Sequence, residues 1–484
     1  MLFNSIEFIL FFLPVTFLVY FFLLRKRLVV GAKGFLIAAS LFFYSWWNIN
    51  YLPLLLFSVL FNFIIGSSLS GVEKGVLIRG KSILVFGVII NLSLLGYFKY
   101  ANFFIDNINF VFDTSFINPS ILLPLAISFF TFQQIAYLVD SYKGETKEYD
   151  FLNYTLFVTF FPQLIAGPIV HHKEMMPQFL KKNNLCKNYR NISLGFFIFS
   201  IGLFKKIIIA DNFSIWASSG FGTTEQLGFF EAWATSLSYT FQLYFDFSAY
   251  TDMAIGAALL FNIKLPINFN SPYKAYNIQD FWQRWHITLS RFLREYIYIP
   301  LGGNRKGDFS TYNNIATTFL IGGIWHGASW MFVFWGALHG IAIIIFHLWA
   351  KLHITLPRYL AWLITFNFIN LTWVIFRAEN WGVAKNILHS MFFGDVILSK
   401  RFESNWGFLS DYGIEFGQFF VHLGGHSTTV YALILGFFLV SMKNSIEMTA
   451  NFRANWKNVI IVFILFMAAL LNIQKPSEFL YFNF

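Results

Sequence analysis

The chain has 484 residues, of which 57% are hydrophobic and only 12% are charged. A soluble protein carries about 25% charged residues, and the mean hydropathy of this chain is +0.59. These values exclude a disordered chain, a disulfide scaffold and a water-soluble enzyme, and they predict a polytopic membrane protein. The net charge of +10 is compatible with nucleic acid, anionic lipid or an acidic ligand as partner, or simply with basic cytoplasmic loops.

Stretches without Asp, Glu, Lys or Arg predict membrane helices along the whole chain, because a spanning helix needs about 20 mostly apolar residues. Two of the stretches are long enough for two passes each. We expect an all-α fold with about 11–13 transmembrane or re-entrant helices. The stretches are 8–24, 34–72, 82–98, 114–139, 151–172, 309–350, 359–376, 416–442 and 458–474, with shorter apolar segments at 191–210 and 229–263.

The basic residues are concentrated at 25–27, 171–190 and 264–306. Positive residues favour the cytoplasmic side, so these segments are expected there and the N-terminus outside. No basic run alternates with aromatic residues in a soluble module, so we expect no nucleic-acid partner. The charge is therefore mainly a topology signal.

Residues 280–299, DFWQRWHITLSRFLREYIYI, have the 3.6-residue period of an amphipathic helix with a basic polar face that includes Arg284. Such a helix suits the membrane interface, and an ordinary surface helix that grips anionic lipid is the simpler reading. His286 falls at the edge of the apolar face, where a histidine is more often an interface residue than a catalyst.

His326 lies deep in the uncharged stretch 309–350. A helix over about 312–334 would place it near the helix centre, where an ionisable residue is costly and usually faces a cavity or a partner. Nearby Gly322, Gly323 and Gly327 would allow close approach of a helix or a substrate. A buried, hydrogen-bonded histidine is an equally good reading of this pattern, and plain helix packing explains the glycines.

Asp246 and Asp252 lie in an otherwise apolar segment, which suggests a proton or ion pathway or hydrogen bonds within the scaffold. Ser248, Tyr250 and Thr251 are available as their partners. The possible counter-charges are Lys205, Lys206 and Asp211.

No metal site is expected. The chain has one cysteine, Cys186, and the glycines between His422 and His426 argue against a regular helical site. His339 and His347 lie in the same apolar stretch, and one or both of them are expected near a membrane interface.

Four blocks of sequence together resemble the membrane-bound O-acyltransferase family, in the bacterial branch of the alginate O-acetyltransferase membrane subunit. The opening MLFNSIEFILFFLP and the closing EFLYFNF resemble that branch as well. The blocks are FFPQLIAGPI at 160–169, YFDFSAYTDMAIG at 244–256, FWQRWHITLSRFLREYIYIPLGGNR at 281–305 and GIWHGASW at 323–330.

The resemblance implies one membrane domain over 1–484, with N-terminal helices in 1–110, a catalytic core at about 114–376 and C-terminal helices in 377–484. It also implies a central tunnel that leads to a catalytic histidine. The family's WHG histidine falls on His326, and a second important position falls on His286. The further candidates for substrate binding or tunnel lining are Gln163, Asp246, Tyr250, Asp252, Arg284, Trp285 and Trp325.

The implied activity is O-acetylation of an extracytoplasmic polysaccharide, alginate, peptidoglycan or another exopolysaccharide. Acetyl-CoA would be the cytoplasmic donor, with no bound cofactor, and a separate periplasmic acetyltransferase would be the partner. The implied location is the bacterial inner membrane. The main alternative is a transporter or flippase in which Asp246, Asp252 and His326 form a proton relay.

Overall fold

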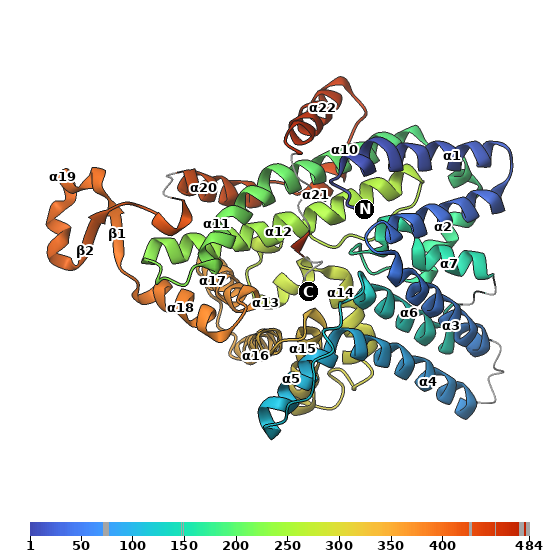
Figure 1. Cartoon of the computed structure of the whole chain (residues 1–484), viewed down its shortest axis with the longest axis horizontal. Coiled ribbons are helices and arrows are strands. Elements are labelled where there is room, and N and C mark those ends of the chain that lie inside the picture. The colour runs from blue at the N-terminus through green and yellow to red at the C-terminus, as the bar shows by residue number, and fades with distance from the viewer. Residues whose placement is uncertain are drawn as a thin grey trace. The chain divides into compact units, whose positions relative to one another are not determined.

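The structure is a computed structural model that describes residues 1–70, 77–146, 148, 150–424, 428–450, 452–473 and 479–480. Nearly all regular structure in these residues is helical (Figure 1). One small sheet is present, in which β1 (Val396–Ser399) and β2 (Ile414–Gly417) pair in parallel with Val396 opposite Ile414. The predicted all-α fold class is confirmed.

The chain divides into two compact units. Unit 1 comprises Met1–Leu203, Ala249–Asn268 and Asn451–Phe484, and unit 2 comprises Phe204–Ser248 and Phe269–Ala450. The long helix α12 (Phe229–Leu260) contributes to both. The expected division into N-terminal, core and C-terminal parts remains a prediction from sequence.

In unit 1, α1 packs along α2, and α3 and α4 pack against α6 (Figure 1). Asn62 on α3 and Asn91 on α4 exchange two side-chain hydrogen bonds of 2.7 and 3.1 Å, which satisfies both amides away from water. The helices are α1 (Leu13–Arg25), α2 (Val29–Ser45), α3 (Leu52–Ser70), α4 (Leu77–Leu95), α5 (Ala101–Phe112), α6 (Ile127–Tyr142), α7 (Phe151–Thr159), α8 (Phe161–Leu164), α9 (His172–Leu180), α10 (Tyr189–Phe204) and α22 (Trp456–Leu471).

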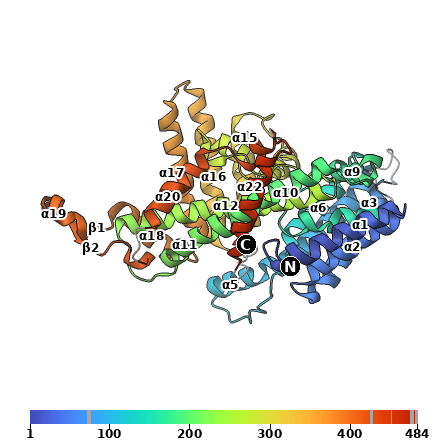
Figure 2. The ribbon, with the colours of Figure 1, turned by 90° about the horizontal axis from the view of Figure 1, so that it is seen from above.

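In unit 2, α15 and α16 form a tight antiparallel pair, and α17 packs beside α16 (Figure 2). The helices are α11 (Asp211–Gly222), α13 (Ile278–Arg284), α14 (Ile287–Leu293), α15 (Asp308–His326), α16 (Trp330–Lys351), α17 (Arg358–Arg377), α18 (Trp381–Phe393), α19 (Glu403–Trp406), α20 (Thr428–Ser441) and α21 (Ser445–Ala450). The apolar stretches 34–72 and 309–350 each form two helices, as predicted.

Short π-helical and 3₁₀ segments join these elements. Residues in π-helical turns are often found at functional sites. The π-helical segments are Glu7–Phe12, Gly96–Tyr100, Lys205–Ala210 and Arg294–Tyr298. The 3₁₀ turns are Ile49–Tyr51, Lys182–Leu185, Pro272–Lys274, Lys400–Phe402, Gly407–Tyr412 and Val421–Leu423.

Within the described ranges, six helical stretches are long and apolar enough to cross a membrane: Glu7–Arg25, Ile49–Ser70, Gly80–Phe112, Tyr189–Gly222, Trp330–Lys351 and Arg358–Arg377. Three shorter apolar helices, α2, α20 and α22, add to them. Helices α12 and α15 carry more polar residues, so apolar composition alone does not select them. The chain is a multi-pass membrane protein, and the count of 11–13 helices remains a prediction.

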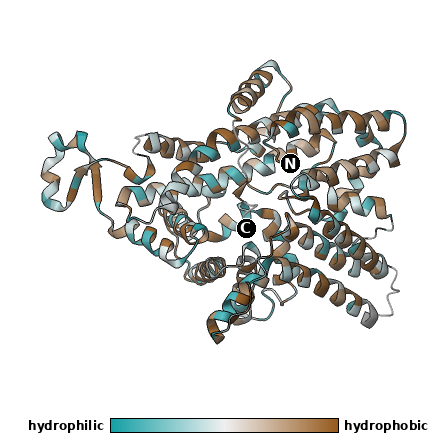
Figure 3. Cartoon of the chain, in the orientation of Figure 1, coloured by the Kyte–Doolittle hydropathy of each residue, from teal (hydrophilic) through white to brown (hydrophobic). Residues whose placement is uncertain are grey.

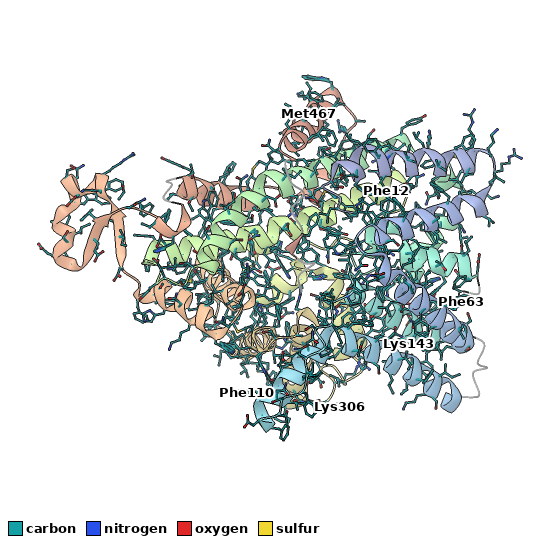
Figure 4. All side chains as sticks on the ribbon, in the orientation of Figure 1. Phe12, Phe63, Phe110, Lys143, Lys306 and Met467 are labelled. Carbon is teal, nitrogen blue, oxygen red and sulfur yellow. The ribbon has the colours of Figure 1, made fainter. Side chains whose placement is uncertain are left out.

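Most of these helices are rich in hydrophobic residues along their length (Figure 3), and many of their large apolar side chains are exposed. Phe110, near the end of α5 in Figure 4, is 89% exposed, and Phe11 and Phe86 are mostly exposed as well. Phenylalanines in such numbers on an outer face indicate contact with lipid rather than with water.

Candidate active site

The predicted continuous helix over 280–299 is wrong. Helix α13 ends at Arg284, α14 begins at Ile287, and the π-helical segment Arg294–Tyr298 follows. Between the two helices His286 adopts the left-handed conformation, with φ of +43°. The predicted apolar face is nevertheless present, because Phe281, Trp282, Trp285, Leu289, Phe292 and Leu293 are all buried.

The break places His286 in the interior of unit 2, and not at an interface edge. Its side chain is fully buried. The imidazole packs edge-on against Phe247 of α12, with ring centroids 4.9 Å apart, and also contacts Trp325 at 6.1 Å. Residue 286 therefore lies against the end of α15.

His326 is the last residue of α15, so the expected helix over 312–334 with His326 at its centre is wrong. Gly327 continues in an extended conformation, and Ser329 caps α16 by accepting a hydrogen bond from the Met331 amide at 3.2 Å. His326 therefore lies at a helix end, next to the short connection to α16, and not within a continuous helix.

Aromatic rings surround the His326 imidazole. Trp335 meets it edge-on at 90° with centroids 5.1 Å apart, and Trp325 and Phe376 lie at 5.1 and 5.3 Å. Only 5% of His326 is exposed. Because Trp325 contacts both histidines, the structure brings His286, Trp325 and His326 together.

The glycines near His326 allow α15 and α16 to approach closely. A Cβ on Gly323 would lie 2.4 Å from the carbonyl oxygen of Phe332, and one on Gly336 would lie 2.5 Å from that of Phe319. The two glycines face each other across the helix pair. Their role is close helix packing, and this packing fixes the end of α15 that carries His326.

His339 is buried in the core, which leaves His347 as the one of the two histidines still predicted at an interface. Its Nδ1 accepts a hydrogen bond from Trp282 Nε1 at 3.2 Å, and its Nε2 lies 3.1 Å from Thr372 Oγ1. The Thr372 hydroxyl in turn donates to the carbonyl of Ile369 at 2.9 Å, so His339 Nε2 carries the proton. His339 ties α13, α16 and α17 together around Trp335.

Trp285 belongs to the same aromatic core. Its ring contacts Phe269 and Trp373, each with centroids 5.1 Å apart, and stacks on Phe281 at 5.6 Å. Sequence reasoning did not single out Trp335, Trp373 or Phe376. The signal for Trp335 was its position four residues before His339, which places both on one face of α16.

Asp246 is neutralised by a buried lysine. Lys206 Nζ lies 2.7 Å from Asp246 Oδ1, which confirms Lys206 as the expected counter-charge of Asp246. Asp211 also pairs with Lys206, with Oδ1 2.9 Å from Nζ. Lys206 belongs to the π-helical segment Lys205–Ala210, and the next residue after Asp246 is Phe247, which contacts His286. The ion pair therefore anchors the part of α12 that packs on the site.

Three candidates, Gln163, Tyr250 and Asp252, belong to unit 1. All three are buried. The Gln163 side chain donates to the carbonyl of Phe157 at 2.6 Å, and Tyr250 Oη accepts from the Ala166 amide at 3.3 Å. Their proposed roles toward a substrate remain predictions.

Arg284 pairs with Asp280 in the same helix, with Nε and Oδ1 2.7 Å apart. It does not line the cavity of about 500 Å³ that lies along α13 and α14 in unit 2. Arg291 of α14 and Arg294, which follows α14, do line this cavity. The cavity is lined by Gln279, Trp282, Gln283, Ile287, Ser290, Arg291, Leu293, Arg294, Tyr298, Ile315, Thr318, Phe319, Ile343 and His347.

Among the residues that the structure describes, no group of three or more His, Cys, Asp or Glu residues is arranged to hold a metal ion. His422 pairs with Glu231 through Nδ1 and with Glu225 through Nε2, both at 2.8 Å. These hydrogen bonds, first to Glu231 and then to Glu225, raise the pKa of His422. His426 lies outside the described residues.

Comparisons with known proteins agree with the resemblance. The sequence profile of the membrane-bound O-acyltransferase family matches residues 141–380, which contain His286 and His326. The chain is 48% identical to a peptidoglycan O-acetyltransferase of Helicobacter pylori, over all of this chain and 98% of the relative. It is 36% identical to a probable alginate O-acetylase AlgI of Pseudomonas putida over the full length of both.

Similarity to a teichoic acid D-alanyltransferase of Streptococcus thermophilus is lower, 27% over 48% of this chain and 59% of the relative. The transporter alternative finds no support in these comparisons. Because the family profile matches and the chain is similar over its full length to proteins named as acetyltransferases, the chain is an acyltransferase that belongs to the membrane-bound O-acyltransferase family.

Proposed function

We propose that the protein is an inner-membrane O-acetyltransferase that takes acetyl from cytoplasmic acetyl-CoA and passes it across the membrane to an extracytoplasmic polysaccharide. The observation that carries the proposal is the position of His326 at the end of α15, enclosed by Trp325, Trp335 and Phe376. A ring held by close edge-on contacts has few orientations, which favours a defined reaction geometry.

His326 would act in one of two ways. As a general base it would take the proton of an acceptor hydroxyl while that oxygen attacks the thioester carbonyl and the coenzyme A thiolate leaves. As a nucleophile it would itself attack the thioester carbonyl, release the coenzyme A thiolate and hold acetyl on a ring nitrogen until a hydroxyl accepts it. In either case positive charge develops on the ring, and the partial negative charge at the C-terminal end of α15 stabilises it.

The cavity along α13 and α14 supports acetyl-CoA as donor. Arg291 and Arg294 line it and would attract the phosphates of coenzyme A. Trp282 on the cavity wall contacts Trp335, whose ring contacts His326, so the cavity wall and His326 belong to one aromatic core. His286 also contacts Trp325 and is proposed to orient the acceptor or Trp325 itself.

Peptidoglycan is the acceptor that the comparisons favour over alginate. The relative named as a peptidoglycan O-acetyltransferase is 48% identical to this chain, whereas the alginate O-acetylases are 36–40% identical. We further propose that a separate periplasmic acetyltransferase takes the acetyl group from this protein and transfers it to the polymer.

The decisive experiment measures transfer of radiolabelled acetyl from acetyl-CoA by the purified protein in nanodiscs, with release of free coenzyme A as a second readout. The His326→Ala variant is expected to lose both activities while it elutes as a folded protein and still binds acetyl-CoA. His389→Ala, which removes an exposed histidine on α18, is the matched control and should keep full activity. Retained transfer in His326→Ala would refute the assignment. Muropeptide analysis of a strain that lacks the gene then tests the acceptor.

A further inference from the structure

A groove of about 890 Å³ lies in unit 1 at the end of the first helix. Leu18, Val19 and Phe22 of α1 form its apolar wall, and Leu18 and Phe22 are 58% and 57% exposed. The groove ends among basic residues, at the point where the basic cluster 25–27 closes the first apolar stretch. It is thus apolar along a membrane helix and cationic at the helix end.

Three cations, Arg25, Arg27 and Lys187, line the groove, and no acidic residue does. None of the ion pairs formed by residues that the structure describes includes any of the three. Lys187 instead lies over the ring of Phe17, with Nζ 5.6 Å from the ring centroid. This positive charge is available to an anionic ligand.

One wall of the groove is held in place. The loop that carries Lys187 is fixed by Asn262, whose side-chain amide donates to the carbonyls of Asn184 and Cys186 at 3.0 and 2.8 Å. Asn191, just after the loop, donates to the Asn262 side-chain oxygen at 3.1 Å. A fixed loop holds Lys187 at its position before any ligand binds, which lowers the entropy cost of binding.

Arg27 occupies a position that usually belongs to glycine. It ends α1 in the left-handed conformation, with φ of +62°, and the amides of Arg27 and Leu28 bond back to the carbonyls of Leu24 and Leu23. This helix ending commonly takes glycine, because other residues pay a conformational cost there. An arginine in this place projects its charge into the groove at the expense of backbone strain, a feature that accompanies binding sites.

We propose that this groove binds one anionic phospholipid, with its phosphate among Arg25, Arg27 and Lys187 and an acyl chain along Leu18 and Phe22 of α1. The apolar wall favours a lipid over a free phosphate or a soluble phosphorylated ligand, because only a lipid carries an acyl chain that contacts this wall while its phosphate lies among the cations. The proposal depends on α1 as a membrane helix and is independent of the acetyl-transfer reaction.

Native mass spectrometry of the full chain, released from nanodiscs of mixed phosphatidylglycerol and phosphatidylcholine, tests the proposal. The wild type is expected to retain one phosphatidylglycerol. A cation near an anionic lipid surface contributes roughly a fivefold preference, so Arg25→Ala, Arg27→Gly and Lys187→Ala together should lower retention roughly a hundredfold. Arg27→Gly alone should lower retention about fivefold without loss of thermal stability, because glycine relieves the strained conformation.

The matched control removes three neighbouring cations that do not line the groove, with Lys181→Ala, Lys182→Ala and Arg190→Ala. Retention in this control should stay close to that of the wild type. Equal losses in both triple variants would show a general surface charge effect and overturn the proposal. Release of the lipid by millimolar inorganic phosphate or coenzyme A would identify a soluble ligand site and overturn it as well, as would unchanged retention in Arg27→Gly.

Discussion

The ion pair between Lys206 and Asp246 gives a quantitative test of how unit 2 is held together. Both side chains are nearly fully buried, whereas Asp211, the second partner of Lys206, is 27% exposed. Removing one partner of a buried pair costs about 3–5 kcal/mol, because the other charge is left without compensation. Removing one partner of a largely solvated pair costs about 0–1 kcal/mol.

We therefore expect Lys206→Met to lower the free energy of unfolding by about 3–5 kcal/mol, and Asp246→Asn by about 3 kcal/mol, since Asp211 still faces Lys206. Asp211→Asn should lower it by about 1 kcal/mol or less. The double variant of Lys206→Met with Asp246→Leu should be more stable than either single variant of the pair, because an apolar replacement of both charges removes the desolvation penalty.

The assay is denaturant unfolding of the purified variants in mixed micelles, followed by tryptophan fluorescence. Lys206→Met, Asp246→Leu and their double variant form the double-mutant cycle, and Asp246→Asn is compared with Asp211→Asn. An Asp246→Asn variant that is no less stable than Asp211→Asn would contradict the reasoning. So would a double variant whose loss equals the sum of the two single losses, because the two charges would then not interact.

Three further outcomes are expected. Gly323→Ala should lower stability by about 1–3 kcal/mol and impair acetyl transfer, because its methyl group pushes α15 from α16, whereas Gly34→Ala, with no atom within 4 Å of its Cβ, should be neutral or stabilising. A raised pKa of His422 means that its pairing with Glu231 stabilises the fold fully below pH 6.5, its ordinary value, and less as pH rises through the raised pKa. Thermal unfolding at several pH values should show this loss in the wild type and not in His422→Ala. His339→Leu should lower stability by about 1–3 kcal/mol, because Trp282 then loses its acceptor, and equal thermal stability would contradict this.

The helix pairs at 34–72 and 309–350 could be predicted from sequence, because length and absence of charge decide how often a stretch can cross a lipid layer. The end of α15 at His326 also had a local signal. Gly327 follows it, and Ser329 is a typical helix-capping residue. The uninterrupted apolar run concealed this signal, since a short break between two apolar helices leaves the composition unchanged.

The break at His286 had no such signal. The 3.6-residue pattern continues through Trp285 and His286, and no glycine or proline interrupts it. The left-handed conformation comes from tertiary packing against Phe247 and Trp325, from helices distant in sequence. The position of His339 was equally inaccessible, because one of its two partners, Thr372, lies 33 residues away.

The backbone at residue 286 determines which substitutions can report on the chemistry of its side chain. At a φ of +43° a β-branched residue is strongly disfavoured, and alanine loses the imidazole and pays a conformational cost together. Asparagine tolerates this conformation almost as well as glycine does. His286→Asn is therefore the variant that removes the imidazole ring while it preserves the break between α13 and α14. This break keeps residue 286 against Trp325.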